Sequence, residues 1–217
     1  MAQIFPPSAN AWARASIVGL LGFIASVFAL GYAINSGGYV TRQNLIRHQE
    51  VPFSHRHHVQ SMGIDCRYCH WSAEESNYAG VPPTHTCMTC HSQIWVDSPM
   101  LAPVRESYDE NKPLVWSKVH DLPDYVYFNH AIHVAKGIGC ASCHGPVQQM
   151  ALVWQDATLH MSWCLECHRN PEEFIRPRSE IYNMTWDPSP ARQEELGRHL
   201  LEAYNVQSQD HCYTCHR

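Results

Sequence analysis

Cys66-Arg67-Tyr68-Cys69-His70 is the first of five Cys-x-x-Cys-His motifs in this chain of 217 residues. The others are Cys87-Met88-Thr89-Cys90-His91, Cys140-Ala141-Ser142-Cys143-His144, Cys164-Leu165-Glu166-Cys167-His168 and Cys212-Tyr213-Thr214-Cys215-His216. Together the five motifs contain all ten cysteines of the chain. The cysteine chemistry of this protein is therefore one arrangement used five times.

This motif is the attachment signature of c-type haem, in which two thiols bond to the vinyl groups and the adjacent imidazole binds the iron. Zinc sites need no histidine directly after each second cysteine. A disulfide framework would not repeat one spacing five times. The sequence therefore predicts five covalently bound haem c groups. Their thioether bonds would involve Cys66, Cys69, Cys87, Cys90, Cys140, Cys143, Cys164, Cys167, Cys212 and Cys215, and their proximal iron ligands would be His70, His91, His144, His168 and His216.

The number of haems limits the kind of fold. If residues 41–217 hold five haems, each haem has roughly 35 residues of chain, too few to build a separate side-chain core around it. The porphyrins should then form much of the core. The 14 prolines and 11 glycines indicate a loop-rich chain. We expect a multihaem cytochrome c fold, mostly irregular, with short α-helices around five haems, little or no sheet, and one N-terminal transmembrane helix.

The N-terminal part of the chain contains a candidate membrane span. Positions 15–34 are mostly apolar and carry no charge, which is enough to cross a bilayer as a helix. We expect a cytoplasmic segment at 1–14, a transmembrane helix at 15–35 and an extracytoplasmic haem domain at 36–217. A cleaved signal peptide is the alternative, because Gly31-Tyr32-Ala33 has a small-x-small pattern. The length of the apolar stretch favours a retained anchor.

A stripe of small residues runs along this predicted helix at Gly19, Gly22, Ser26, Ala29 and Ala33. Such a stripe allows a neighbouring transmembrane helix to approach closely. Alanine and glycine are also common in membrane helices in general. The stripe is therefore compatible with a place in a membrane complex and with ordinary composition.

The haem region contains an internal repeat. Phe53-Ser54-His55-Arg56-His57-His58-Val59 recurs as Phe128-Asn129-His130-Ala131-Ile132-His133-Val134, and each copy leads to a Gly-Ile-x-Cys and then to a second motif. The connector between copy and motif differs by one residue. We interpret 51–91 and 126–168 as repeated two-haem modules, with a fifth haem appended at 199–217.

The repeated Phe-x-His-x-x-His element resembles that of small multihaem cytochromes of the c3 and c7 kind. The resemblance implies that His55 and His130 bind the irons of the Cys66 and Cys140 haems, while His58 and His133 reach neighbouring haems. His57, adjacent to His58, is an alternative, and the repeat alignment favours His58.

One further sixth ligand is needed to complete a set of five. Our first choice is His120, and Met161, three residues before Cys164, is a serious rival that would raise the potential of its haem. Other candidates are His160, His199 and His211, followed by His48 and His85. If all five irons have two axial ligands, none can bind a substrate directly.

The overall charge excludes some functions. The formal net charge is −5, and the 15 Lys and Arg residues form no dense basic run. Nucleic acid is therefore not an expected partner.

Three stretches together resemble the pentahaem, membrane-anchored cytochrome subunit of alternative complex III, a quinol:electron-acceptor oxidoreductase. They are residues 4–10 (IFPPSAN), 119–130 (VHDLPDYVYFNH) and 163–169 (WCLECHR). In that family the position of His160 is more often a small polar residue, so His160 and Met161 compete as ligands.

The resemblance implies an electron-transfer subunit with no substrate site of its own. Quinol would be oxidised in a polytopic partner subunit, with an iron–sulfur subunit nearby. Electrons would pass through five haems to a monohaem cytochrome c or another soluble acceptor. The chain would be a single-pass protein of the inner membrane with its haem domain in the periplasm.

Two other function classes remain as alternatives. A NapC/NrfH-like membrane-anchored multihaem quinol dehydrogenase also has one N-terminal anchor and several c haems, and binds quinol itself at the haem nearest the membrane. Here, however, the first motif lies 31 residues after the predicted span. A multihaem reductase would need an open iron position. The predicted span itself carries no ionisable residue that could form a quinol site.

Overall fold

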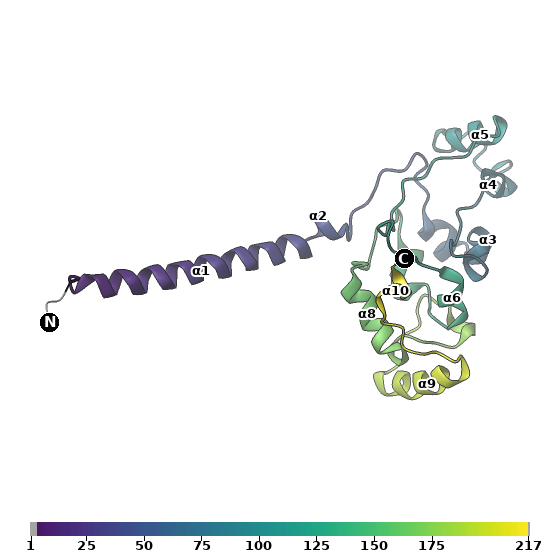
Figure 1. Cartoon of the computed structure of the whole chain (residues 1–217). Coiled ribbons are helices and arrows are strands. Elements are labelled where there is room, and N and C mark those ends of the chain that lie inside the picture. Colours follow the sequence, from purple (N-terminus) through teal and green to yellow (C-terminus); the bar gives the residue numbers. More distant parts are fainter. Residues whose placement is uncertain (1–3, 217) are drawn as a thin grey trace. The chain divides into compact units, whose positions relative to one another are not determined.

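A computed structural model describes residues 4–216 of the chain (Figure 1). The chain divides into two compact units, Met1–Arg42 and Gln43–Arg217, and each is described here by itself. Residues 1–3 of the predicted N-terminal segment and residue 217 of the predicted fifth-haem segment lie outside the described residues.

The first unit is a long helix, α1 (Ser8–Ser36), followed by the short α2 (Gly38–Thr41). The 29 residues of α1 span about 43 Å at 1.5 Å per residue, more than the ~30 Å apolar thickness of a bilayer. The stretch Ser8–Thr41 is apolar and long enough to cross a membrane, a test that a signal sequence also passes. The helix begins before the predicted residue 15, directly after Pro7, because proline has no N–H to leave unpaired in a first helical turn.

The second unit is made of short helices joined by irregular segments. Its α-helices are α3 (Cys66–Cys69), α4 (Thr84–His91), α5 (Ala102–Asp109), α6 (His130–Ala135), α7 (Ala141–His144), α8 (Met161–Arg169), α9 (Pro190–Ala203) and α10 (Cys212–Cys215). Among residues 4–216 there is no strand, and the only sheet-like pairings are three isolated bridges. The predicted mixture of short helices and irregular chain is confirmed.

Each Cys-x-x-Cys-His motif lies on or at the end of one of these helices, namely α3, α4, α7, α8 and α10. A single helical turn brings residues i, i+3 and i+4 to the same face. Two thiols and one imidazole can therefore be presented together by as few as five residues.

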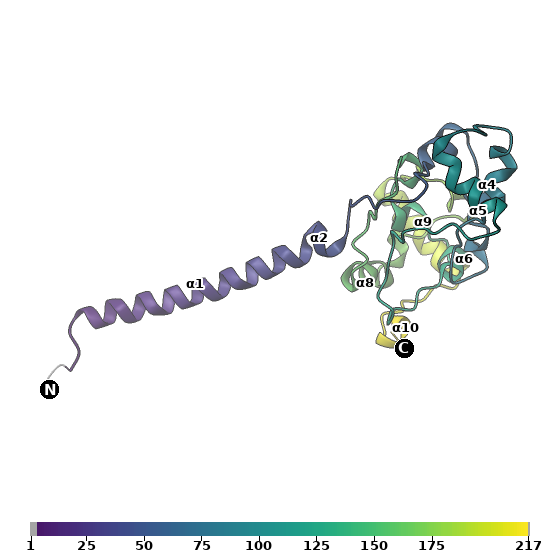
Figure 2. The same cartoon turned by 90° about the horizontal axis from the view of Figure 1, so that it is seen from above.

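Within the second unit, α4 and α5 lie together at one end, and α8 and α9 lie toward the other (Figure 1). The helices α3 and α6 lie between these groups. The view from above again shows α4 and α5 together, and α10 at a protruding edge (Figure 2). The motif-bearing helices are thus spread through the unit rather than gathered around one centre.

The polypeptide buries few apolar side chains against itself. In the described residues the buried apolar set is Val51, Ala73, Leu101, Val104, Met150, Ile175, Ile181 and Leu200. Its one compact cluster joins Val51, Leu101 and Val104. Eight side chains are too few to hold more than 170 residues, so the chain is suited to pack around other apolar bodies.

The two copies of the repeat fold differently at the point where their lengths differ. The first copy forms a π-helix, η1 (Arg56–Ser61), whereas the second forms the α-helix α6. A π-turn holds one more residue than an α-turn. The extra residue is therefore accommodated in η1.

The hydrogen bonds that close the two copies join equivalent residues. In the first copy the N–H of Gly63 donates to the oxygen of Val59 (2.9 Å), and that of Ile64 donates to His58 (3.1 Å). The second copy has the same bonds from Gly137 to Val134 (3.0 Å) and from Ile138 to His133 (3.0 Å). Both glycines adopt a left-handed conformation, with φ of 70° and 83°. The backbone that leads into each motif is therefore the same in both copies, despite the inserted residue.

Candidate haem-binding sites

Four of the five motif histidines face a second histidine ring. The ring centres of His55 and His70 are 6.4 Å apart, with an angle of 3° between the ring planes. Those of His130 and His144 are 6.4 Å apart at 12°. The remaining pairs are His58 with His91, at 6.2 Å and 66°, and His133 with His168, at 6.1 Å and 64°.

These separations fit an iron held between two imidazoles. A metal–nitrogen bond of about 2 Å on each side, plus about 1.1 Å from nitrogen to ring centre, places the two ring centres about 6 Å apart. Directly stacked rings would lie closer together. The four pairs therefore have the geometry expected of axial ligands to haem iron.

A phenylalanine orients the two distal histidines of each copy. Phe53 meets His55 edge-on at 4.9 Å and stacks with His58 at 4.4 Å. Phe128 repeats this arrangement in the second copy, at 4.7 Å from His130 and 4.5 Å from His133. The repeat seen in the sequence is thus a repeat of side-chain geometry, and it fixes the direction of all four rings.

Hydrogen bonds fix which ring nitrogen of these histidines is free. The Nδ1 atoms of several motif histidines contact backbone oxygens, namely His70 to Gly80 (2.7 Å), His91 to Ile94 (3.1 Å), His168 to Gln209 (2.9 Å) and His216 to Tyr125 (3.2 Å). Three facing histidines do the same, namely His58 to Ser54 (2.9 Å), His130 to Asn77 (2.9 Å) and His133 to Asn129 (2.7 Å). A carbonyl oxygen only accepts, so Nδ1 carries the proton and Nε2 is available for a metal.

Burial also favours the neutral form of these imidazoles. Burial, with smaller contributions from nearby histidines, lowers the pKa of His55 to about 4 and that of His144 to about 3. Burial also lowers the pKa of His58 and that of His133. A metal-binding imidazole must be neutral, so the sites are ready to bind metal at neutral pH.

The structure separates the two neighbouring candidates, His57 and His58. His58 faces His91, whereas His57 stacks on Trp95 at 5.7 Å with an angle of 24° between the rings. His57 therefore packs against the loop that follows the second motif. Only His58 has the position that an axial ligand would need.

This difference gives a direct test with a matched control. Replacing His58 by alanine should open one iron position, because the ring opposite His91 is removed. The reduced protein should then bind carbon monoxide at one haem, seen as a shifted Soret band. His57→Ala should bind none, and carbon monoxide binding by His57→Ala instead would contradict the assignment.

The fifth motif is held by residues 125–127, a segment far from it in sequence. The N–H of Tyr127 donates to the oxygen of Cys215 (2.8 Å), and Val126 and His216 form an antiparallel bridge. The ring of His216 lies 5.7 Å from that of Tyr125. The position of the fifth motif is therefore fixed beside the strand-like segment that precedes α6.

Met161 lies at the start of α8, one turn before Cys164, and its side chain is 64% exposed. Burial raises the pKa of the Cys164 thiol, and the nearby thiol of Cys215 raises it further. The start of α8 is thus close to the fifth motif.

His120, the first choice for the remaining sixth ligand, lies beside the third motif. Its ring is 4.3 Å from that of His144 and tilted by 69°. That distance is shorter than the 6.1–6.4 Å of the four facing pairs, and His144 already faces His130. The buried Nε2 atom of His120 has no hydrogen-bond partner. His120 is positioned to pack on His144.

Asp65 and Arg176 stabilise the surroundings of the motifs and were missed in the sequence. Asp65 caps α3 by accepting a hydrogen bond from the N–H of Arg67 (2.8 Å), and its bonds to Arg67 lower its pKa to about 2. Arg176 is buried beside the third motif and donates to Ser142 (3.2 Å). The contact of Arg176 with Ser142 joins distant segments, so no local sequence pattern could indicate it. Aspartate is a preferred residue directly before a helix, and that local signal could have indicated Asp65.

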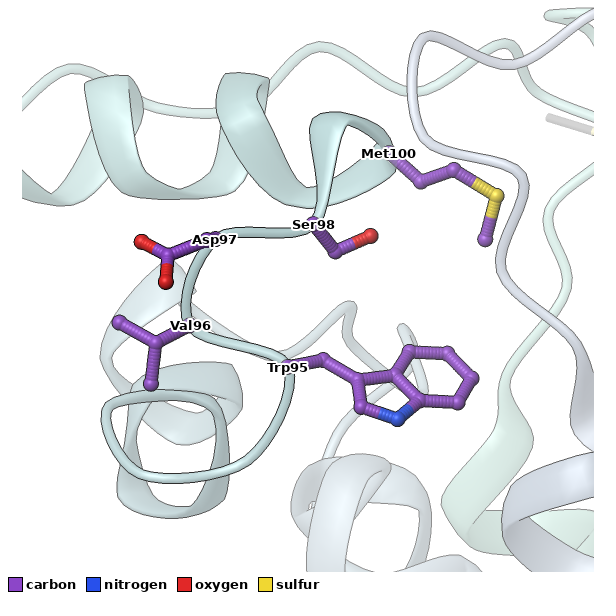
Figure 3. A pocket seen from close by; sticks show the side chains of 5 residues that line it. All are labelled: Trp95, Val96, Asp97, Ser98 and Met100. Carbon is purple, nitrogen blue, oxygen red and sulfur yellow. The ribbon is translucent and has the colours of Figure 1, made fainter.

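The loop after the second motif exposes apolar side chains. Ile94, Trp95 and Met100 are each about half exposed. Figure 3 shows the Trp95 indole and the Met100 thioether on one side of this loop, with Val96 and Asp97 on the other. The backbone of Trp95 is left-handed, with φ of 56°, which turns its side chain toward His57.

Comparison with known proteins agrees with these sites. Residues 126–217 match the family described as Cytochrome c7 and related cytochrome c. The chain is also 36% identical over 99 residues to the menaquinone reductase, multihaem cytochrome c subunit, of Nitratidesulfovibrio vulgaris (strain Hildenborough). That similarity covers 45% of this chain and 46% of the relative, less than half of either. Residues 126–217 are thus similar to multihaem cytochromes c, a class with covalently bound haem c.

Proposed function

We propose that this chain is the electron-transfer subunit of a quinone-linked membrane oxidoreductase and carries five c-type haems. The observation that carries the proposal is the set of four facing histidine pairs, each with one member in a Cys-x-x-Cys-His motif. Haem c supplies one-electron transfer at its iron. Two protein ligands on an iron leave no position for a substrate, which suits transfer rather than catalysis.

The protein's own part is to hold and insulate these groups. Hydrogen bonds from Nδ1 atoms to backbone oxygens hold the imidazoles in fixed directions. The phenylalanines of the repeat pack between distal histidines and exclude water there. Fixed ligands and low water access keep the structural reorganisation that accompanies electron transfer small. They also set the reduction potentials of the haems.

The finer assignment we propose is alternative complex III. In that assignment α1 anchors the chain in the inner membrane, and the haem domain lies on the extracytoplasmic side. A polytopic partner subunit oxidises quinol, an iron–sulfur subunit lies nearby, and a monohaem cytochrome c or another soluble protein accepts the electrons. The resemblance of residues 4–10, 119–130 and 163–169 supports this assignment.

The relative from Nitratidesulfovibrio vulgaris is a menaquinone reductase subunit, which supports a second direction of electron flow. A menaquinone reductase delivers electrons to the quinone, whereas alternative complex III removes them from quinol. Both are quinone-linked membrane complexes. The haem potentials decide between them, since a relay that accepts electrons from quinol needs haems of higher potential than the quinone couple.

The test is purification through a tag on this chain in mild detergent, followed by identification of the co-purifying subunits and by addition of menaquinol. We expect a polytopic membrane protein in the complex and haem reduction only when that protein is present. If the chain alone is reduced rapidly by menaquinol, it is instead a NapC/NrfH-like quinol dehydrogenase.

We also propose Met161 as the sixth ligand of the fifth iron, because the start of α8 lies close to the Cys215 thiol. Replacing Met161 by leucine should lower the potential of one haem, since thioether ligation raises the potential of haem iron. Met88→Leu, inside the second motif, is the control and should leave all potentials in place. Unchanged optical and redox titrations in Met161→Leu would return His120, His160, His199 and His211 to consideration.

A further inference from the structure

We infer that the five motifs are arranged in space in the order second, first, third, fourth, fifth, so that the Cys87 and Cys212 motifs are the two ends of the haem row. This inference rests on the proposal that each motif carries a haem. It goes beyond that proposal by identifying which haems can face a redox partner directly. Each neighbouring pair in this order is joined by contacts that the chain itself makes.

The second and first motifs are joined twice. His58, which faces the second motif, and His55, which faces the first, lie one turn apart at η1 with Phe53 between their rings. The hydroxyl groups of Tyr68 in the first motif and Thr89 in the second are 2.8 Å apart. The two motifs therefore lie side by side.

The first and third motifs are joined by the segment that follows the first. The backbone oxygen of Asn77 accepts hydrogen bonds from both the N–H (3.3 Å) and the Nδ1 atom (2.9 Å) of His130, which faces the third motif. Tyr182 donates to Glu74 (2.7 Å) and lies beneath Arg67 of the first motif (4.8 Å). Its neighbour Ile181 accepts from the N–H of Cys140 (3.1 Å).

The third and fourth motifs are joined as the first two are. His130 and His133 lie one turn apart on α6 with Phe128 between their rings, and they face His144 and His168. The second module thus places its own two haem sites next to each other.

The fourth and fifth motifs are joined by the segment that leads into α10. Ser208 donates to the oxygen of His168 (2.8 Å), and the Nδ1 atom of His168 donates to Gln209 (2.9 Å). Asp210 lies 3.8 Å from Arg169. Only one residue, His211, separates this segment from Cys212 in the sequence, so the fifth motif follows the fourth in space.

The second motif has its other contacts at the end of the unit. Its helix α4 packs on α5, and the two lie together beyond α3 (Figure 1). The exposed Ile94, Trp95 and Met100 border this motif. Electrons moving between the second and third motifs would therefore pass the first, against the order of the sequence.

The test uses the isolated full chain and two ligand variants, His58→Met at the proposed end and His130→Met at the proposed centre. A thioether ligand raises the potential of its haem, which is then reduced first. Each reduced iron has lost one positive charge, so its neighbours in space should titrate at lower potential than in the unsubstituted chain.

Electron paramagnetic resonance identifies the neighbours. Imidazole planes that are nearly parallel, as at the first and third motifs, give a different class of ferric spectrum from steeply tilted planes, as at the second and fourth. In His130→Met, we expect one parallel-type and one tilted-type signal to shift. In His58→Met, we expect one parallel-type signal to shift and the others to stay.

The order of the sequence makes the opposite prediction. It would shift two tilted-type signals in His130→Met and two parallel-type signals in His58→Met, and that result would overturn our inference. Failure of the chain to co-purify with a quinone-linked partner would overturn the proposed function and leave the order intact.

A second measurement needs no substitution. Iron positions from anomalous scattering by crystals of the unsubstituted chain should show the iron of the second motif with one close neighbour and that of the first with two. Two close neighbours around the iron of the second motif would overturn the proposed order even if neither variant matures.

Discussion

Replacing Cys140 and Cys143 by alanine is expected to remove one haem and to destabilise the whole haem domain. The third motif lies among buried groups, since burial raises the pKa of the Cys140 thiol to about 11 and that of Cys143 to about 12. Its histidine contacts the rings of both His120 and His130. Loss of a porphyrin at the third motif should lower the free energy of unfolding by more than about 4 kcal/mol, which is beyond the usual range for point substitutions.

The matched control removes the fifth haem through Cys212→Ala and Cys215→Ala. Cys212 is exposed and lies near the end of the chain. The pyridine haemochrome assay should give five haems per chain for the unsubstituted protein and four for this control, with little loss of thermal stability. If the third-motif variant proves as stable as the control, the porphyrins are not the core of this domain.

Replacing Gly137 by alanine should strongly destabilise the haem domain. The residue has a φ of 83°, and an added Cβ atom would lie 2.6 Å from the backbone oxygen of Arg176 and 2.9 Å from the ring of Tyr204. Backbone strain and overpacking together should destabilise the domain by about 3 kcal/mol. Circular dichroism of the protein with all haems bound should show a lower denaturation midpoint for the variant.

The equivalent glycine of the first copy is a built-in control. Gly63 has a φ of 70°, but an added Cβ atom would meet no other atom within 4 Å. Gly63→Ala should therefore cost only the backbone strain, about 1 kcal/mol. Equal losses for the two variants would mean that the packing of Gly137 on Arg176 contributes nothing.

The motifs and the repeat made much of this molecule predictable. A Cys-x-x-Cys-His motif needs one helical turn, so its local structure follows from five residues, and the short helices were expected. The repeat indicated His55, His58, His130 and His133, and the structure places each of them opposite a motif histidine. These features are local or are repeated along the chain.

The features that escaped the sequence depend on distant segments. The position of His120 beside His144 could not be predicted, because the path of residues 112–125 is fixed by tertiary contacts that no periodicity shows. The order of the motifs in space depends on contacts such as that between Asn77 and His130, which are 53 residues apart. The start of α1 at Ser8 shows that the helix continues beyond its apolar part.

The π-helix η1 shows how the two copies of the repeat differ in length and still present their ligands alike. An insertion in an α-helix normally rotates everything that follows by about 100° per residue, which would turn a ligand away from its metal. Here the insertion is confined to one widened turn, and Gly63 and Ile64 keep the hydrogen bonds of their counterparts. The two copies therefore share the direction of two imidazoles although the number of residues between these imidazoles and the next motif differs. Related chains should be aligned by these hydrogen-bonded positions, since counting residues would place the two modules out of register.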